Sequence, residues 1–280
     1  MSEKISLDSS VMKFIYCLLF FLFASYVEAQ EIDSVRLRIH YASKFKAWED
    51  SKKLSSDEHI LDIGKTRSKF YSLWETKTDE IRNNILAHGG TFQEVQNALG
   101  KSAYPRSYQY YVVYKNYPRK GKTTYTDKEF KNYMYEEDLE KPQWRICTDE
   151  SITIADYQCQ KAQTDFRGRT WSAWFTTDIP ISDGPWKLCG LPGLILKAED
   201  KKGEFLFECI EIKNIDKEAI SIPKLKYIKC SRESLKQLLI KSAKDPVGYF
   251  RQLGIETSTG IDANGKPLKY DDKMPVFLEY

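Results

Sequence analysis

Hydrophobic and polar residues alternate along much of this chain, and strict alternation is typical of a strand with one buried face. The first example is residues 34–41, in which Val35, Leu37 and Ile39 are separated by arginines. Similar patterns predict further strands at residues 59–63, 68–74, 108–114, 143–153, 157–164, 170–176, 194–198 and 204–212. Turn sequences at Ala155-Asp156 and at residues 200–203 indicate that neighbouring strands form antiparallel hairpins.

Helical spacing is found in three segments. Two short helices are expected at residues 78–86 and 91–99, each beginning with a threonine that suits the N-cap and separated by Gly89-Gly90. The strongest pattern is at residues 232–244, with Ser231 as its N-cap. Four of its apolar residues share one face, and Pro246 ends the helix: Leu235, Leu238, Leu239 and Ala243.

Together these elements predict an α+β fold. We expect a large curved, mainly antiparallel sheet that wraps the C-terminal helix, with a small helical insertion near residues 78–99. The sequence contains no internal repeat and no low-complexity linker. Its length suits one large domain, which we place at residues 30–280.

Residues 1–29 are typical of a secretory signal peptide. Lys13 precedes an unbroken apolar run over residues 14–24, and Val27-Glu28-Ala29 resembles a signal peptidase site. The run has 11 residues, whereas a membrane-spanning helix needs roughly 20. Residues 1–11 are polar and acidic, so we expect translation to start at Met12. We therefore expect cleavage near Ala29 and a periplasmic or otherwise exported chain that has no transmembrane segment.

Charge and histidine content exclude several classes of partner. The formal net charge is +3, and both signs are interspersed without a block of like charge, so nucleic acid is not an expected partner. His40, His59 and His88 lack metal-ligand spacing, and no pair of cysteines forms a C-x-x-C motif. We expect no metal and no other cofactor.

Export would place five cysteines in an oxidising compartment, where disulfides form and persist. These are Cys147, Cys159, Cys189, Cys209 and Cys230. We expect two disulfides and one remaining thiol, with the connectivity left open. Cys159 and Cys189 bracket the densest motif of the chain and are the favoured participants.

That motif runs from Tyr157 to Asp200 and centres on Gly190-Leu191-Pro192-Gly193-Leu194-Ile195. Upstream of the hexapeptide come, in order, the phrases CQKA (159–162), FRGR (166–169), AWFT (173–176), IP (179–180) and GPW (184–186). In this series, and in residues 63–72, the chain resembles the GLPGLI family, which is named after the hexapeptide. The resemblance implies an exported protein of Gram-negative bacteria, of a kind often encoded near outer-membrane transport receptors. It implies no activity.

The hexapeptide can be interpreted in two ways. Gly190 and Gly193 allow a sharp turn or a close backbone approach, while Pro192 holds Leu191 extended. The segment is then either an apolar loop that plugs the open end of the curved sheet or a lip that grips a ligand. Burial of leucine and isoleucine favours the plug, because these side chains supply no chemistry.

Further candidate contact residues lie upstream of the hexapeptide. Arg167 and Arg169 flank Gly168 and could bind a carboxylate or phosphate, or be solvated beside a hairpin turn. Trp174 has polar neighbours on its face of the strand, and Trp186 follows the turn at Gly184-Pro185. Aromatic residues rimmed by polar groups are typical of contact sites.

No catalytic motif for a nucleophile, a metal or a nucleotide is found. The leading hypothesis is an exported envelope binding protein that holds an apolar ligand or a peptide segment, without catalysis. One alternative is an accessory protein of an outer-membrane receptor that binds through a Trp174/Trp186 surface. A second is a hydrolase that uses a carboxylate pair, drawn from Asp156, Asp165, Asp178, Asp183 and Asp200.

Overall fold

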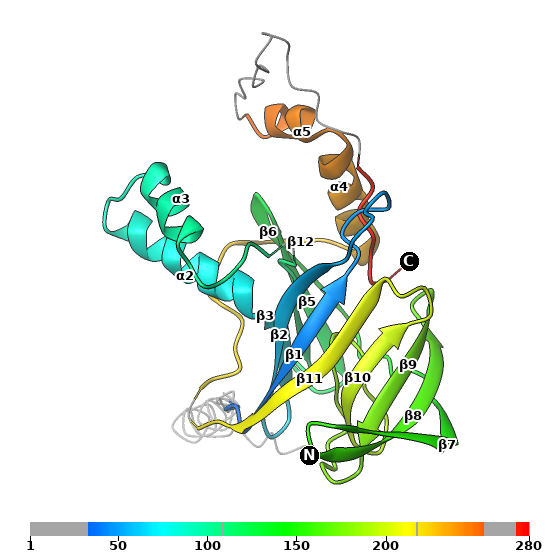
Figure 1. Cartoon of the computed structure of the whole chain (residues 1–280). Coiled ribbons are helices and arrows are strands. Elements are labelled where there is room, and N and C mark those ends of the chain that lie inside the picture. The colour runs from blue at the N-terminus through cyan, green and yellow to red at the C-terminus, as the bar shows by residue number, and fades with distance from the viewer. Residues whose placement is uncertain (1–32, 108, 217, 255–272, 280) are drawn as a thin grey trace, which may run out of the picture.

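The computed structural model describes residues 33–107, 109–216, 218–254 and 273–279 (Figure 1). A sheet of 12 strands dominates it, in the order β12-β6-β5-β4-β3-β2-β1-β11-β10-β9-β8-β7. The strands are β1 (Leu37–Phe45), β2 (Ser55–Ile63), β3 (Ser68–Ser72), β4 (Val112–Lys115), β5 (Lys122–Glu129), β6 (Lys131–Asp138), β7 (Arg145–Ile154), β8 (Tyr157–Phe166), β9 (Arg169–Thr176), β10 (Leu194–Asp200), β11 (Phe205–Asn214) and β12 (Tyr227–Lys229). Neighbouring strands are antiparallel apart from β12, which runs parallel to β6.

Four helices are described: α2 (Leu73–Ala87), α3 (Phe92–Gly100), α4 (Arg232–Lys244) and α5 (Pro246–Gln252). In Figure 1 the α2–α3 hairpin projects from one side of the sheet, and α4 and α5 stand at the end of the sheet near β6. The predicted α+β class with a large, mainly antiparallel sheet is confirmed, and this sheet is open. None of the helices in the described ranges is long and apolar enough to cross a membrane.

Helix ends follow local capping chemistry. Thr91 caps α3 through a reciprocal capping box with Glu94, and Ser231 caps α4 by accepting a hydrogen bond from the Ser234 backbone, as the sequence predicts. The predicted start at Thr78 is wrong. Because Ser72 accepts a hydrogen bond from the backbone of Glu75, α2 begins one turn earlier, directly after β3.

The hairpin of β5 and β6 was not predicted, nor was β12. On β5 the inward positions carry Thr123, Tyr125 and Asp127 in place of aliphatic residues. A strand with so little aliphatic content gives a weak hydrophobic signal although its alternation is regular. This hairpin forms one end of the sheet and, as shown below, the floor of a cavity.

The centre of the concave face is filled by a loop, residues 177–193. Its Trp186, Leu188 and Leu191 are buried in the main core beside Tyr41 and Phe70 of the sheet. Helix α4 instead packs near the end of the sheet, where Leu235 contacts Tyr133 and Tyr135 of β6. The sheet therefore curves around both the loop and α4 and leaves a space between them.

Residues 273–279 run beside this space. Pro275 forms a bridge with Trp48, and the Val276 backbone N–H donates to the carbonyl of Ala47 at 3.1 Å. The predicted signal peptide and most of the polar tail, residues 255–272, lie outside the described residues.

Candidate functional site

A cavity of about 660 Å³ lies between strands β5 and β6, residues 109–111, helix α4 and residues 273–279. Aromatic residues from adjacent strands line its floor, together with Trp186 from the central loop. Leu235 and Leu239 of α4 line another wall, and Phe277 and Leu278 belong to the C-terminal segment that lines a third. The cavity is therefore an open one, lined by segments that lie far apart in the sequence.

Three stacked tyrosines form the floor, and we call them the tyrosine ladder: Tyr111, Tyr125 and Tyr135. The ring centroids of Tyr111 and Tyr125 are 5.7 Å apart, and those of Tyr125 and Tyr135 are 4.9 Å apart. The planes are tilted by 12° and 16°, so the rings stack face to face. The stacking follows from strand register, which places Tyr125 opposite Tyr135 on the same face of the sheet.

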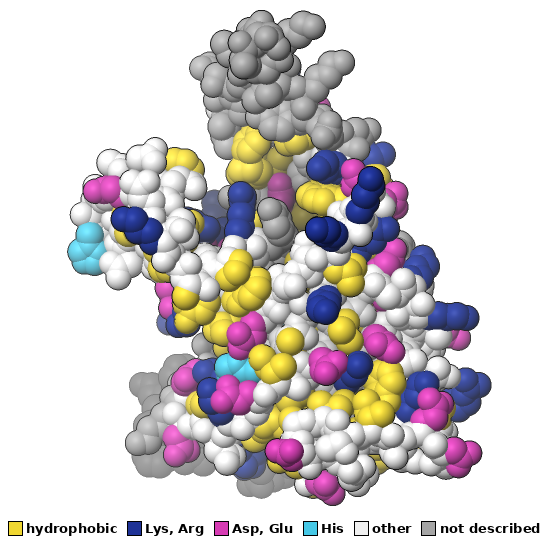
Figure 2. All heavy atoms as spheres, viewed as in Figure 1, with side chains coloured by type: hydrophobic (Ala, Val, Ile, Leu, Met, Phe, Trp, Pro, Cys, Tyr) yellow, Lys and Arg dark blue, Asp and Glu magenta, His cyan; other side chains and the backbone are white. Residues whose placement is uncertain are grey.

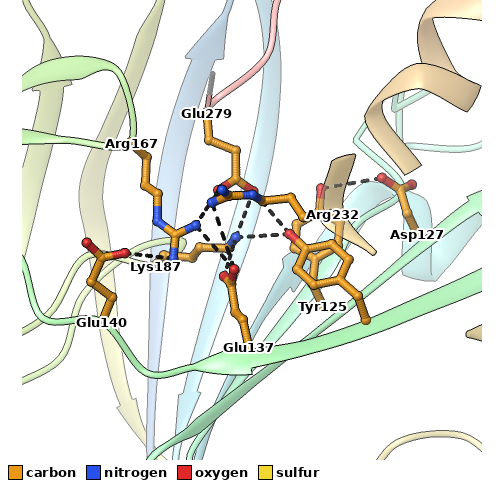
Figure 3. Close-up of polar contacts among 9 residues, drawn as sticks. Tyr125, Asp127, Glu137, Glu140, Arg167, Lys187, Arg232 and Glu279 are labelled. Carbon is orange, nitrogen blue, oxygen red and sulfur yellow. Dashed lines mark hydrogen bonds and ion pairs between the residues drawn. The ribbon is translucent and has the colours of Figure 1, made fainter. Parts of the chain in front are cut away.

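An ion-pair cluster lies at the Tyr135 end of the ladder (Figure 3). Lys187 Nζ lies 2.7 Å from both Glu137 Oε1 and Glu279 Oε1, and it donates to the Tyr135 hydroxyl at 2.9 Å. Arg167 pairs with the same two carboxylates at 3.2 and 3.5 Å. We call this group the Glu137–Glu279 cluster; it connects the C-terminal segment to the sheet and to the central loop.

Two acidic residues occupy the opposite side of the ladder, Asp127 and Glu129 on β5. Both line the cavity, and among the residues that the structure describes neither forms an ion pair. Burial, with a smaller contribution from the nearby Glu129, raises the pKa of Asp127 to about 6. Burial also raises the pKa of Glu129, which is hydrogen-bonded to Ser242 of α4. In Figure 3 Asp127 lies beyond Tyr125 as seen from Lys187.

A second group of buried polar residues connects α2 to the sheet. Asp57 accepts hydrogen bonds from the hydroxyls of Ser72 at 2.9 Å and Ser107 at 2.5 Å, and burial raises its pKa to about 6. His59 stacks on Phe70 and is held neutral, because burial lowers its pKa to about 3. Since Ser72 is also the N-cap of α2, this group serves to anchor the helical hairpin.

The predicted anion grip at Arg167 and Arg169 is occupied from within the protein. The Arg169 guanidinium is buried, lies 2.7 Å from Asp200 and 2.8 Å from Glu204, and donates to the carbonyl of Phe277. Arg167 contacts the Glu137–Glu279 cluster and also Glu140 at 2.8 Å. Arginine forks do bind carboxylates here, but the carboxylates are the chain's own.

The turn chemistry around these arginines is confirmed. Arg167 and Gly168 have φ values of 53° and 80° and form the two-residue connection between β8 and β9. Gly190 has φ of 97°, which glycine adopts readily. At Gly193 a Cβ atom would lie 2.0 Å from the carbonyl oxygen of Thr176, so only glycine allows this close approach. Gly184-Pro185 turns inside the central loop, where Lys115 donates to the Gly184 carbonyl at 2.6 Å.

The predicted exposed surface at Trp174 and Trp186 is wrong. Trp186 is 0% and Trp174 is 9% exposed, because both pack into the main core. Trp186 does line the cavity, whereas Leu191 is buried away from it and Pro192 is not among the lining residues. The position of Leu191 in the core supports the interpretation of the hexapeptide as a plug.

The predicted disulfides are not present among the described residues, where all five cysteines are free thiols. Strand register gives the reason for the pair on neighbouring strands, since Cys147 lies opposite Lys161 and Cys159 lies opposite Ile152. Burial raises the pKa of Cys159 to about 11, so this thiol is unreactive.

Three of the five acidic residues that we considered for a catalytic pair also have internal partners. Asp200 binds Arg169, Asp183 pairs with Lys115, and Asp165 accepts a hydrogen bond from Thr170. The carboxylates with raised pKa are Asp57, Asp127, Glu75 and Glu129, which the sequence analysis did not single out. The alternation of Thr123, Tyr125, Asp127 and Glu129 is the signal that could have found two of them.

Neither sign of charge dominates the face of the molecule that Figure 2 presents. Figure 2 shows basic and acidic side chains interspersed over the face that it presents. Many of them are matched in pairs across adjacent strands, such as Lys122 with Asp138 and Lys197 with Glu208. Exposed pairs of this kind contribute little binding specificity.

Part of the chain matches the model of a known family. A family model described as "Protein of unknown function (Porph_ging)" matches residues 111–197, a range that includes the tyrosine ladder, Asp127, Glu129 and the hexapeptide. No curated protein matches the chain. Two solved structures of PNGF-II, in space groups P21 and C2, are 19% identical to it, with TM-scores of 0.49 and 0.48. Each alignment covers 75% of this chain, which spans about a third (34%) of the other.

Proposed function

We propose that the protein is an exported binding protein that holds an apolar ligand or an apolar peptide segment in the cavity above the tyrosine ladder. The observation that carries the proposal is the cavity itself. Its volume of about 660 Å³ falls within the roughly 300–1,000 Å³ typical of sites for small ligands. Its lining combines aromatic residues and leucines with charged side chains of both signs.

Two further observations support the proposal. The segment over residues 12–29 has the pattern of a signal peptide, which supports export and an envelope location. The matched family region contains the hexapeptide and its upstream phrases, which supports a relationship to the GLPGLI family. The alternative of a receptor partner loses the exposed tryptophan surface on which it was based.

A substitution that fills the cavity tests the proposal. Ala243 lies on α4 and lines the cavity, so Ala243→Trp places an indole ring in the space where a ligand would lie. Nile red, a neutral apolar dye, serves as the probe, and its fluorescence is titrated with the purified chain. We expect saturable binding to the natural protein and at least tenfold weaker binding to Ala243→Trp.

The matched control is Ala87→Trp, at the exposed C-terminal end of α2. It adds the same indole on a helix that does not line the cavity, and we expect it to bind Nile red like the natural protein. Equal binding by Ala243→Trp and Ala87→Trp would contradict the proposal, provided that both variants melt at the temperature of the natural protein.

A further inference from the structure

The two ends of the tyrosine ladder differ in charge balance. At the Tyr135 end, the Lys187 ammonium and the Arg167 guanidinium together balance the charges of Glu137 and Glu279. The same ammonium lies 5.2 Å from the ring centroids of both Tyr125 and Tyr135, within cation–π range. One cation, the ammonium group of the protein's own Lys187, thus already lies against the ladder.

On the opposite side of the ladder, beside Tyr125, Asp127 and Glu129 form no ion pair with any described residue, although Arg232, Lys236 and Lys273 also line the cavity. Asp127 and Glu129 are two positions apart on β5, so both side chains point to the concave face. The nearest hydrogen bonds to Asp127 come from the Tyr125 hydroxyl at 3.3 Å and the Lys128 backbone at 2.8 Å, and both groups are uncharged. Lys128 directs its ammonium away, to Asp79 at 2.9 Å.

An unpartnered donor accompanies these carboxylates. Tyr111 is 6% exposed and lines the cavity, yet its hydroxyl has no hydrogen-bond partner within the described part of the chain. A buried hydroxyl without a partner is costly, and binding sites are among the places where such groups are retained. Stacked tyrosines and two carboxylates thus line a single cavity, and the unpartnered Tyr111 hydroxyl lies buried beside it.

From this geometry we propose that the cavity binds an organic amine, with the ammonium group between Asp127 and Glu129 and an apolar body against the tyrosine ladder. The inference rests on the proposed binding function and names the chemical class of its ligand. An ammonium offers three hydrogen-bond donors, which match acidic oxygens, and charge-assisted bonds of this kind are short and strong. A metal ion fits less well, because no group of three or more His, Cys, Asp or Glu side chains converges among the described residues.

Proton linkage gives the site a distinct signature. Burial raises the pKa of Asp127 to about 6, so below that pH the carboxyl is protonated in the empty cavity. A bound ammonium favours the ionised form, and binding must then release a proton. The affinity for an amine is therefore expected to fall as the pH is lowered from 7 to 5, whereas the affinity for a neutral ligand stays constant.

The test compares tryptamine with tryptophol, which share an indole body and differ in carrying an ammonium or a hydroxyl group. Binding to the full chain is measured by calorimetry at pH 7.5 and pH 5.0. At pH 7.5 we expect tryptamine to bind about 10- to 100-fold more tightly than tryptophol. At pH 5.0 tryptamine should lose most of this advantage. Asp127→Asn and Glu129→Gln should each reduce the advantage, and the double variant should abolish it.

The matched control is Asp149→Asn, which removes one exposed carboxylate on β7 and should leave the preference unchanged. Equal affinities of the two ligands for the natural protein would overturn the inference, and so would a preference that survives in the double variant. Binding of Nile red separates a failure of the amine assignment from a failure of the proposed binding function. If the dye binds and tryptamine has no advantage, the amine assignment is wrong while the binding function stands; if the dye does not bind, both are wrong.

Discussion

The two halves of the concave face are built differently. Over β1 and β9–β11 the central loop fills the space, and Trp186, Leu188 and Leu191 leave the core closely packed. Over β5, β6 and residues 109–111 the space stays open, bounded by α4 and residues 273–279. We call these the packed half and the open half.

Individual carboxylates of the two halves also differ in their partners. In the packed half Arg169 and Asp200, each about 1% exposed in the side chain, neutralise one another. In the open half Asp127 and Glu129 face the cavity and form no ion pair with any described residue. The contrast indicates that the packed half provides stability and that the open half is free to bind, and each prediction below tests this division.

The largest effect is expected from Arg169→Met. Removing the guanidinium leaves Asp200 buried without its partner, and breaking a buried ion pair costs about 3–5 kcal/mol of unfolding free energy. The matched change Arg232→Met affects an arginine that is 42% exposed and contacts Glu279 at 3.4 Å, and an exposed pair contributes below about 1 kcal/mol. Urea unfolding measures both, and similar losses would contradict the division.

A smaller difference is expected between two leucines. Leu188 is 0% exposed in the packed half, whereas Leu239 lies on the wall of the cavity. Leu188→Ala should lower the free energy of unfolding by about 2–5 kcal/mol, because it creates a new void in a dense core. Leu239→Ala only enlarges an existing space and should cost less than half as much. Equal losses in urea unfolding would show that the open half is as tightly packed as the other.

The packed half is also the part that the sequence predicts best. The hairpins at Ala155-Asp156 and at residues 200–203 carry strong turn signals, and the structure has both. The glycines of the hexapeptide identify a sharp turn and a close approach, which Gly190 and Gly193 provide. Local sequence is sufficient here because each element is determined by its own turn and its own alternation.

The open half could not be predicted in the same way. Its floor is β5 and β6, where tyrosine and threonine replace aliphatic residues and weaken the hydrophobic pattern. Its walls come from α4 and residues 273–279, which lie far along the chain from β5 and β6. The partners of Arg167 could not be predicted from the sequence either, because Glu137 and Glu279 approach it only in the folded chain. Contacts between segments that lie far apart in the sequence produce no local pattern of residues, so they cannot be predicted from such a pattern.

The smallest effect concerns the pH dependence of stability and isolates Asp127. Its pKa rises from 3.8 to about 6 on folding, because burial disfavours the charged form. The folded chain therefore holds the proton more tightly than the unfolded chain, and this group makes stability fall as the pH rises from about 4 to 6. Asparagine does not titrate. Asp127→Asn should thus be more stable than the natural protein by on the order of 1 kcal/mol at pH 7, and the gain should vanish near pH 4.

Thermal and urea unfolding at pH 4, 5, 6 and 7 measure this difference. The contributions of Asp57 and His59 are present in both proteins and cancel, so the change with pH belongs to Asp127. Asp149→Asn on exposed β7 is the control, and its stability difference should not vary with pH. A gain from Asp127→Asn that stays constant from pH 4 to 7 would mean that this carboxylate is already compensated, and the open half would then lack the uncompensated charge that distinguishes it from the packed half.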